Sequence, residues 1–259
     1  MRYLALVLIT IISFPIFAGP AEEKGLEIAK EADNRDKGFQ DQKADLKMIL
    51  RNRQGDKSVR KLSIKTLEGK TDGDKSLILF SHPKDVDGTA LLTFTHKTDA
   101  DDQWLFLPAL KRVKRIASQN KSGPFMGSEF SYEDFTAQEV EKYDYKYIKN
   151  TPCGGKRECF KIERYPKDKY SGYKREVVWL DTKHYRTLKV EFYDKKDDLL
   201  KTLKLKNYKK YLGKYWRAHK LEMYNHQTKK RTTLLWRDFE FKNNFDENDF
   251  NQSTLRRAG

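Results

Sequence analysis

The chain has few histidines and none of the short motifs of enzymes. The chain contains only five histidines: His82, His96, His184, His219 and His226. None of them forms an HxH or HExxH cluster, and no G-x-S-x-G nucleophile elbow is present. The adjacent acids Glu133 and Asp134 do not face each other on a helix or a strand, so they do not make an acid–base pair. The sequence therefore predicts no catalytic residue, no metal site, no cofactor and no enzymatic activity.

Long hydrophobic runs are also scarce, since hydrophobic residues make up 37% of the chain. The one continuous apolar run, residues 3–12, is shorter than the roughly 20 residues that span a bilayer. It follows Arg2 and precedes SFPIFA, which ends in the small residue Ala18, as in a cleavable signal peptide. An uncleaved membrane anchor is the alternative. No cysteine follows the run, so a lipobox is absent. We expect a signal peptide at 1–18 and an exported domain at 19–259, in the periplasm of a Gram-negative bacterium.

Cysteine occurs only twice, at Cys153 and Cys159. In an oxidising compartment a pair this close in sequence favours a disulfide, which closes a short loop and stabilises the fold by roughly 2 kcal/mol. A redox site is the first alternative, but the C-x-x-C spacing is missing. A zinc site is the second, but it requires two further ligands. The pattern therefore indicates a structural disulfide.

Acidic residues are outnumbered, with 38 Asp and Glu against 53 Lys and Arg, which gives a formal net charge of +15. Such a charge attracts polyanions: nucleic acid, anionic lipid headgroups, lipopolysaccharide or an acidic protein surface. Export makes nucleic acid an unsuitable partner. Aromatic residues reach 13% and supply large apolar area per side chain, so the chain can still bury one sizeable core in a single domain.

A period-two pattern of apolar residues fills the chain after a short helical segment at 22–36. Apolar and polar residues alternate near 46–50, 62–66, 91–94, 104–107 and at further positions from 143 to 236. Gly- and Asp-containing turns separate these runs, and no gap is long enough for a crossover helix. The fold class we predict is mainly β (α+β): an incomplete antiparallel barrel of about eleven strands, with a few short helices plugging its open side.

Residues 103–135 form the most informative segment. An apolar strand (QWLFLP) leads into a basic cluster, Lys111, Arg112, Lys114 and Arg115, and then into the loop PFMGS. The cluster has two interpretations: an edge strand protected from aggregation by its charges, or a docking patch for acidic headgroups or an acidic partner. The loop, with Phe125 and Met126 between two glycines, is a fixed plug or a mobile lid.

This order of signal peptide, short helix and QWLFLPALKRVKRIA…KSGPFMGSEFSYEDF resembles the LolA/LolB-like outer-membrane lipoprotein-sorting superfamily, in its uncharacterised periplasmic branch. The resemblance covers essentially the whole mature chain, and residues 103–135 are its specific part. It implies an apolar cavity that shelters acyl chains, and an inner-membrane permease of the resistance-nodulation-division (MMPL-like) type as partner. No lipoprotein-binding residue of the family matches a position here, so a lipoprotein and another acylated lipid are equally compatible cargoes.

The function we expect is therefore a monomeric periplasmic carrier that passes a lipid or lipoprotein toward the outer membrane and touches membrane surfaces transiently. The alternative is an accessory module of an exporter that contacts its partner and carries nothing. The strand pattern places the following residues on the cavity wall and lid: Leu46, Met48, Leu62, Ile64, Leu92, Phe94, Trp104, Phe106, Phe125 and Met126.

Overall fold

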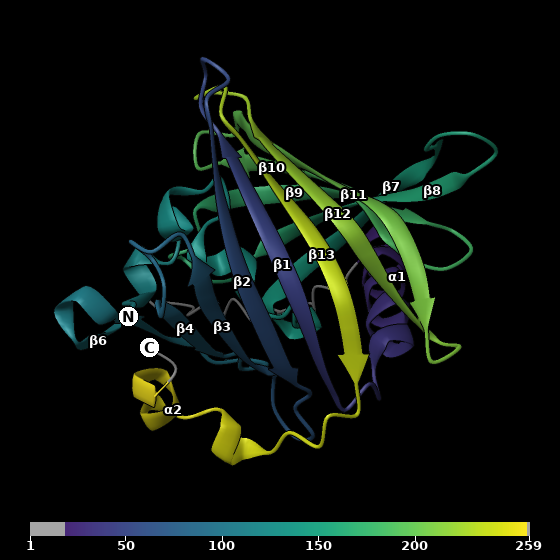
Figure 1. Ribbon diagram of the computed structural model, residues 1–259. Helices are drawn as coiled ribbons and strands as arrows, with labels where there is room; N and C mark the ends of the chain where they lie inside the picture. The colour runs from purple at the N-terminus through teal and green to yellow at the C-terminus, as the bar shows by residue number, and fades with distance from the viewer. Residues whose placement is uncertain (1–18, 258–259) are drawn as a thin grey trace, which may run out of the picture.

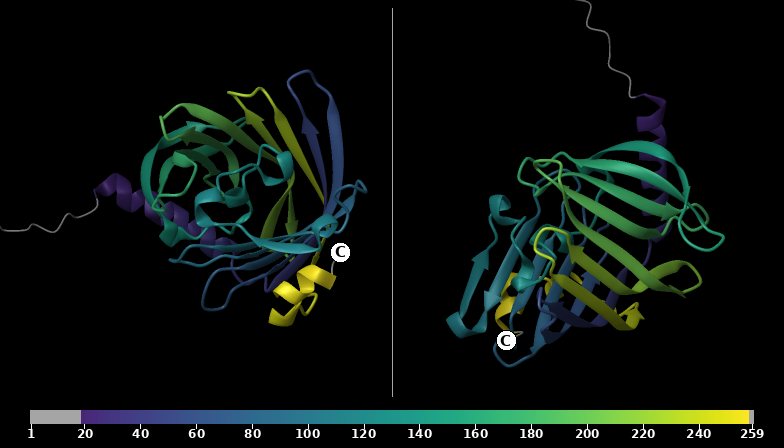
Figure 2. Two further views of the ribbon diagram at one scale, coloured as in Figure 1. Left: turned by 90° about the vertical axis from the view of Figure 1, so that its left-hand side faces the viewer. Right: turned by 90° about the horizontal axis from the view of Figure 1, so that it is seen from above.

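Thirteen antiparallel strands dominate the protein, whose computed structural model describes residues 19–257. The signal peptide expected at 1–18 lies outside the described residues. The strands form one sheet that curls strongly without closing on itself (Figures 1 and 2). The predicted incomplete barrel is thus confirmed. The described residues hold thirteen strands rather than about eleven, in part because the basic cluster forms a short strand of its own.

The elements follow one another in a simple order. The first half comprises α1 (Pro20–Asp36), β1 (Asp41–Arg51), β2 (Lys57–Leu67), β3 (Lys75–His82), β4 (Ala90–Phe94), β5 (Asp102–Leu107) and β6 (Arg112–Arg115). The second half comprises β7 (Tyr143–Pro152), β8 (Glu158–Pro166), β9 (Tyr173–Asp181), β10 (Thr187–Asp194), β11 (Leu199–Tyr211), β12 (Tyr215–Asn225), β13 (Arg231–Phe241) and α2 (Gln252–Arg257). Residues 116–142, which connect the halves, contain only short 3₁₀ turns.

The sheet order is β6-β5-β4-β3-β2-β1-β13-β12-β11-β10-β9-β8-β7. Strands that are neighbours in sequence pair as hairpins, and the β1–β13 pairing joins the two halves. The two free edges are therefore β6 and β7, and residues 116–142 link these edges through the interior of the curved sheet (Figure 2).

Strands β3, β4 and β5 are buried on both faces, which explains their continuous apolar sequences. Ile78, Leu91 and Leu105 point into the main core on the concave side. Their neighbours Leu92 and Phe106 point to the convex side, where they pack with the C-terminal segment that ends in α2. This C-terminal cover was not predicted.

Helix α1 lies against the free edge of the sheet at β7. It starts with Pro20, and acidic residues occupy its first turn, as the helix dipole favours. Gly25 is buried because the helix crosses β7 at very close range. A Cβ at this position would lie 2.8 Å from the backbone nitrogens of Lys146 and Tyr147. The helix thereby covers one sheet edge, while the charged β6 forms the other.

The predicted disulfide is confirmed: Cys153 and Cys159 are bonded, with their Cα atoms 5.8 Å apart. The bond closes the tip of the β7–β8 hairpin, which projects from the barrel (Figure 1). Cys159 is fully buried on the convex face against Val177 and Trp179, so the bond also belongs to a small third core.

Candidate functional site

A cavity of about 1940 Å³ occupies the concave side of the sheet. It opens at the end of the barrel where β1, β3 and β12 begin and β2, β4 and β11 end. Typical pockets for small ligands measure roughly 300–1,000 Å³, so this space accommodates a larger or longer molecule. Helix α1 forms part of its wall through Ala29 and Ala32, whose small side chains leave the space open.

The inner wall is aliphatic and aromatic. Its apolar residues from the sheet are Tyr145, Ile162, Val178, Leu180, Leu205, Tyr208 and Trp216. Two of the tyrosines are held by protein contacts: Tyr208 donates a hydrogen bond to the carbonyl of Thr187, and Tyr145 packs in the main core. Burial raises the pKa of the Tyr208 hydroxyl far above its usual value, so the phenol stays neutral.

Two arginines, Arg164 and Arg186, reach this wall, and each pairs with a buried carboxylate; Arg186 donates to Asp181 at 2.7 Å. Arg164 donates two hydrogen bonds, of 2.9 and 2.5 Å, to the Glu176 carboxylate, which is almost completely buried. The pair leaves the interior without net charge at this point, which suits an apolar guest.

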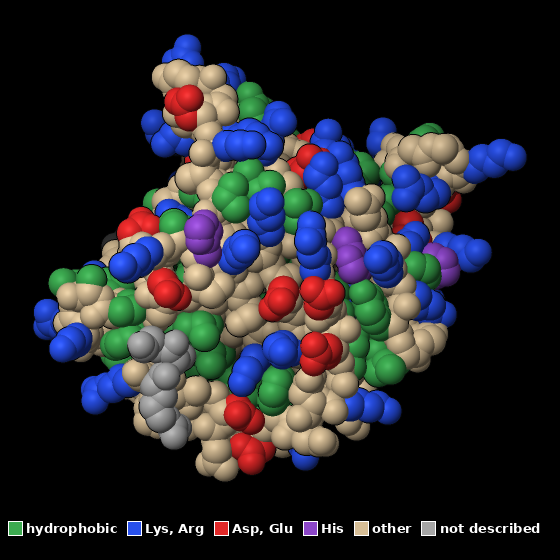
Figure 3. Space-filling view, in the orientation of Figure 1, with side chains coloured by type: hydrophobic (Ala, Val, Ile, Leu, Met, Phe, Trp, Pro, Cys, Tyr) green, Lys and Arg blue, Asp and Glu red, His purple; other side chains and the backbone are tan. Residues whose placement is uncertain are grey.

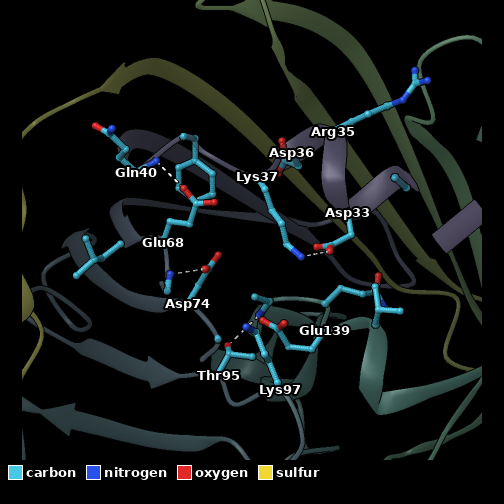
Figure 4. A pocket seen from close by; sticks show the side chains of 18 of the residues that line it. Asp33, Arg35, Asp36, Lys37, Gln40, Glu68, Asp74, Thr95, Lys97 and Glu139 are labelled. Atoms are coloured by element: carbon cyan, nitrogen blue, oxygen red, sulfur yellow. Dashed lines mark hydrogen bonds and ion pairs between the residues drawn. The ribbon is translucent and has the colours of Figure 1, made fainter. Parts of the chain in front are cut away.

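The mouth of the cavity, in contrast, is lined by charged side chains of both signs, with Lys37, Lys210 and Lys214 beside several carboxylates. Glu68, Asp74 and Glu139 point into the same space, below the C-terminal end of α1 (Figure 4). Glu68 accepts hydrogen bonds from the backbone N–H groups of Gly38 (2.6 Å) and Gln40 (2.7 Å). Asp74 accepts one from the Gly69 N–H at 2.9 Å. These bonds fix the turn between β2 and β3 to the segment that follows α1.

Two of these carboxyl groups have pKa values well above their usual range. Burial raises the pKa of Glu139 to about 7, and the nearby Asp74 raises it further. Burial raises the pKa of Asp74 to about 6, and repulsion by Glu68 and Asp36 raises it further. The hydrogen bond from the Gly69 N–H lowers it only in part. The charge of the mouth therefore changes near neutral pH.

The opposite end of the barrel is closed by residues 121–136, here called the plug. Phe125 is fully buried, in contact with Phe80, Tyr132 and Phe135. The plug meets the sheet where β9, β11 and β13 begin, which is the end away from the cavity mouth.

Buried polar contacts hold the plug in place. Lys201 donates to Asp134 at 2.6 Å and to the Glu129 carbonyl at 3.2 Å, and the Tyr173 hydroxyl donates to Asp134 at 2.8 Å. The side chains of Lys201 and Asp134 are only 4% and 8% exposed. Asn225 adds a 2.7 Å hydrogen bond to the Glu129 carboxylate. These contacts favour a fixed plug over a lid.

The structure separates the residues predicted for the cavity wall into three groups. Leu46, Met48, Leu62 and Phe125 lie together in the main core, with Ile64 and Met126 packed against it. Leu92, Phe94, Trp104 and Phe106 belong to the convex cluster instead. Of the ten, only Phe94 borders the cavity. The alternating pattern could not select the correct face of β4 and β5, because both faces are buried.

The predicted anion-docking residues lie away from the cavity. Lys111 ends the β5–β6 turn and Arg112 begins the edge strand, and both are exposed, as is Lys114. Arg115 is also exposed, and it pairs with Asp102. None of the four borders the cavity.

The charged mouth was missed by sequence reasoning. The Gly- and Asp-rich segment at 68–74 was interpreted only as a turn. Among residues 19–257 no three His, Cys, Asp or Glu side chains gather as metal ligands. In the same range no helix is both long and apolar enough to cross a membrane.

Comparison with solved structures places this architecture in a known class, the LolA-like open barrel. A domain from Vibrio parahaemolyticus, provisionally described as an outer membrane lipoprotein-sorting protein, is 56% identical, with a TM-score of 0.89 over 91% of this chain and 100% of that domain. A DUF1329 family protein from Desulfovibrio piger is 30% identical, with a TM-score of 0.86 over 91% of this chain and 99% of that one.

A LolA superfamily protein from Nitrosomonas europaea shares the fold, with a TM-score of 0.71 and 17% identity over 89% of this chain and 98% of that one. A family model described only as an uncharacterized protein matches residues 72–257. The comparison with curated proteins gave no match. The chain belongs to the family of this lipoprotein-sorting domain and the DUF1329 protein, and it shares the fold of the LolA superfamily protein. The resemblance stated for the sequence is thus confirmed.

Proposed function

We propose that this protein is a periplasmic carrier that shelters the acyl chains of a lipoprotein or another lipid in the cavity behind α1. The observation that carries the proposal is the cavity itself, which is apolar in its depth, charged at its mouth and closed by the plug at its far end. The family membership supports the same function, since the most similar structure reported above is described as a lipoprotein-sorting domain.

The energetics of acyl transfer explain why a cavity of this kind is useful. Each CH₂ group removed from water gains roughly 0.8 kcal/mol, so a sixteen-carbon chain gains on the order of 12 kcal/mol. A lipid therefore crosses an aqueous compartment very slowly without an escort. The apolar wall lowers this barrier, while the charged mouth keeps the headgroup in contact with water.

The direct test is mass spectrometry of lipids that remain bound after native purification, combined with titration of a fluorescent fatty acid. Leu205 lines the cavity, and Leu79 packs on the convex face. We expect Leu205→Gln to weaken probe binding at least tenfold and Leu79→Gln to leave it within about twofold, since only Leu205 contacts the guest. A protein that carries no lipid and takes up no probe would show the proposal to be wrong.

We further propose that the basic cluster on β6 docks on an acidic face of an inner-membrane permease. The cluster is exposed on a free sheet edge and none of its residues lines the cavity, so docking through it leaves the mouth accessible. A photo-crosslinker at Arg112 should capture a membrane protein in cells, and one at Lys206, on the outer surface of β11, should not. Failure at Arg112 removes the permease from the proposal without affecting the carrier.

The same surface supports a second candidate, an accessory module that docks and carries nothing. Retained permease crosslinking combined with absent lipid binding would favour this candidate over the carrier.

A further inference from the structure

Few large hydrophobic side chains are exposed in residues 19–257, and two of them are leucines at hairpin tips. Leu110 is 66% exposed at the β5–β6 tip, and Leu212 is 54% exposed at the β11–β12 tip. Only the second tip borders the cavity, because its residues Lys210, Gly213 and Lys214 line the mouth. Figure 1 shows the β11–β12 tip projecting at the lower right, beside the end of α1.

The backbone of this turn gives no reason for a leucine. Leu212 and Gly213 have φ values of +48° and +68°, so both lie in the left-handed region typical of tight hairpin turns. Asn or Asp is preferred at the first of these positions, because its short polar side chain can hydrogen-bond to the nearby backbone. A branched apolar side chain makes no such contact there. A residue that is conformationally unfavourable and exposed to water suggests a role outside the fold.

Lysines surround the exposed leucine. Lys209, Lys210 and Lys214 are all exposed, and none of them forms an ion pair with a described residue. Lys214 donates to the carbonyl of Lys37, which leaves its charge without an acidic partner. Lys and Arg side chains also form many of the outermost points on the face drawn in Figure 3. The tip therefore presents an exposed leucine that is surrounded by lysines without acidic partners.

Aromatic rings lie directly behind the tip. Tyr211 packs against Phe239 and Phe241, each at a centroid distance of 5.4 Å, and Tyr215 stacks on Phe241 at 6.0 Å. Aromatic residues with one polar end favour the boundary between lipid headgroups and acyl chains. The tip thus combines a leucine, lysines beside it and aromatic rings behind it, which are residue types that suit acyl chains, lipid phosphates and the membrane interface, respectively.

We propose that residues 209–214 dock on an anionic lipid surface, with Leu212 entering the bilayer, so that the cavity mouth faces the membrane. The proposal deepens the carrier function and rests on it, since it names the surface at which cargo passes. A lipid surface fits better than an acidic protein, because flexible lysines suit mobile phosphates and an isolated exposed leucine matches fluid acyl chains.

Vesicle flotation of the mature protein tests this inference. The vesicles contain phosphatidylethanolamine with phosphatidylglycerol, or phosphatidylcholine alone as the neutral comparison. We expect binding to the anionic vesicles only. Leu212→Ser should weaken it roughly fivefold, because about half of one leucine side chain loses its apolar environment. Lys209→Gln with Lys210→Gln should weaken it on the order of 30-fold, since each lysine contributes roughly fivefold at an anionic surface.

The β5–β6 tip supplies matched controls. Leu110→Ser removes an equally exposed leucine, and Lys111→Gln with Arg112→Gln removes the same number of charges. We expect both controls to retain binding within about twofold, apart from the small effect of net charge. Equal losses at both tips would show that binding reflects net charge alone and would overturn the proposal, as would no binding to anionic vesicles.

Probe uptake in solution separates this inference from the carrier function. The Leu212→Ser protein should take up a fluorescent fatty acid as the unchanged protein does, while its vesicle binding falls. If the unchanged protein takes up the probe but does not bind vesicles, the membrane-docking proposal is wrong and the carrier proposal stands. Absent uptake with intact docking would contradict the carrier alone.

Discussion

The plug that closes one end of the barrel depends on a buried ion pair, and removing one partner should be costly. Lys201→Met keeps most of the side-chain volume but removes the charge that faces Asp134, whose side chain is 8% exposed. Breaking a buried pair costs roughly 3–5 kcal/mol, because the remaining charge stays desolvated. Asp134 keeps hydrogen bonds from the Tyr173 hydroxyl (2.8 Å) and the Ser131 N–H (2.7 Å). We therefore expect a loss of about 3 kcal/mol in the free energy of unfolding.

Urea unfolding followed by tryptophan fluorescence measures this loss. With a slope of roughly 2–3 kcal/mol per molar urea, the unfolding midpoint should fall by about 1 M. Lys206→Met on the same strand is the control, since Lys206 pairs with Glu222 while 48% exposed, and such pairs contribute below about 1 kcal/mol. A loss below about 1 kcal/mol for Lys201→Met would refute the reasoning, and so would equal losses for both variants.

Three further changes test other parts of the structure. Gly25→Ala should destabilise the protein by roughly 1–3 kcal/mol, because the added Cβ would lie 2.8 Å from the β7 backbone. In a helix with open space at this position, the same change would stabilise the fold. A higher unfolding midpoint in urea would contradict the close packing of α1. The pKa of Glu139 is about 7 in the folded protein and near 4.5 in the unfolded chain, so the folded protein binds a proton more tightly. This proton stabilises the fold at low pH, and the stabilisation is lost as the pH rises through 7. Glu139→Gln should therefore flatten the fall in Tm between about pH 5 and 8, and an unchanged fall would contradict the raised pKa of Glu139. Replacing Cys153 and Cys159 by Ser should cost about 2 kcal/mol in urea unfolding, and reduction of the unchanged protein should have the same effect; no loss would show that the bond does not constrain the chain.

The open antiparallel barrel could be predicted from the sequence because it is built from local signals. Alternating apolar residues and Gly/Asp turns identify antiparallel hairpins, and Pro20 with the acids after it marks the start of α1. The close cysteine spacing identified the disulfide. The strand count was low in part because KRVKR has no apolar face, and its pairing with β5 depends on tertiary structure.

The cavity could not be located from the sequence, because it depends on which face of each strand is concave. In β4 and β5 both faces are apolar, so Leu92 and Phe106 were assigned to the wall although they pack under the C-terminal segment. The mouth brings Glu139 beside the turn that carries Glu68 and Asp74, more than sixty residues earlier in the chain. Their proximity has no counterpart in spacing or periodicity.

The position of the plug also required the tertiary structure. The sequence showed that Phe125 and Met126 lie between glycines, which is equally consistent with a lid and with a plug. The deciding features are the complete burial of Phe125 and the contacts of Lys201 with Asp134 and the Glu129 carbonyl. Lys201 lies more than sixty residues further along the chain, where its sequence neighbours suggest an exposed strand.

The central claim is that the space behind α1 holds an acyl chain, and filling that space tests it most directly. Ala32 lines the cavity, and Asn34 is exposed on the same helix. Fluorescent fatty-acid titration of Ala32→Trp should show probe binding reduced at least tenfold at an unchanged Tm, because the indole occupies the volume of several CH₂ groups. Asn34→Trp should bind the probe like the unchanged protein. Full binding by a folded Ala32→Trp protein would contradict the account, since the probe would then occupy another place.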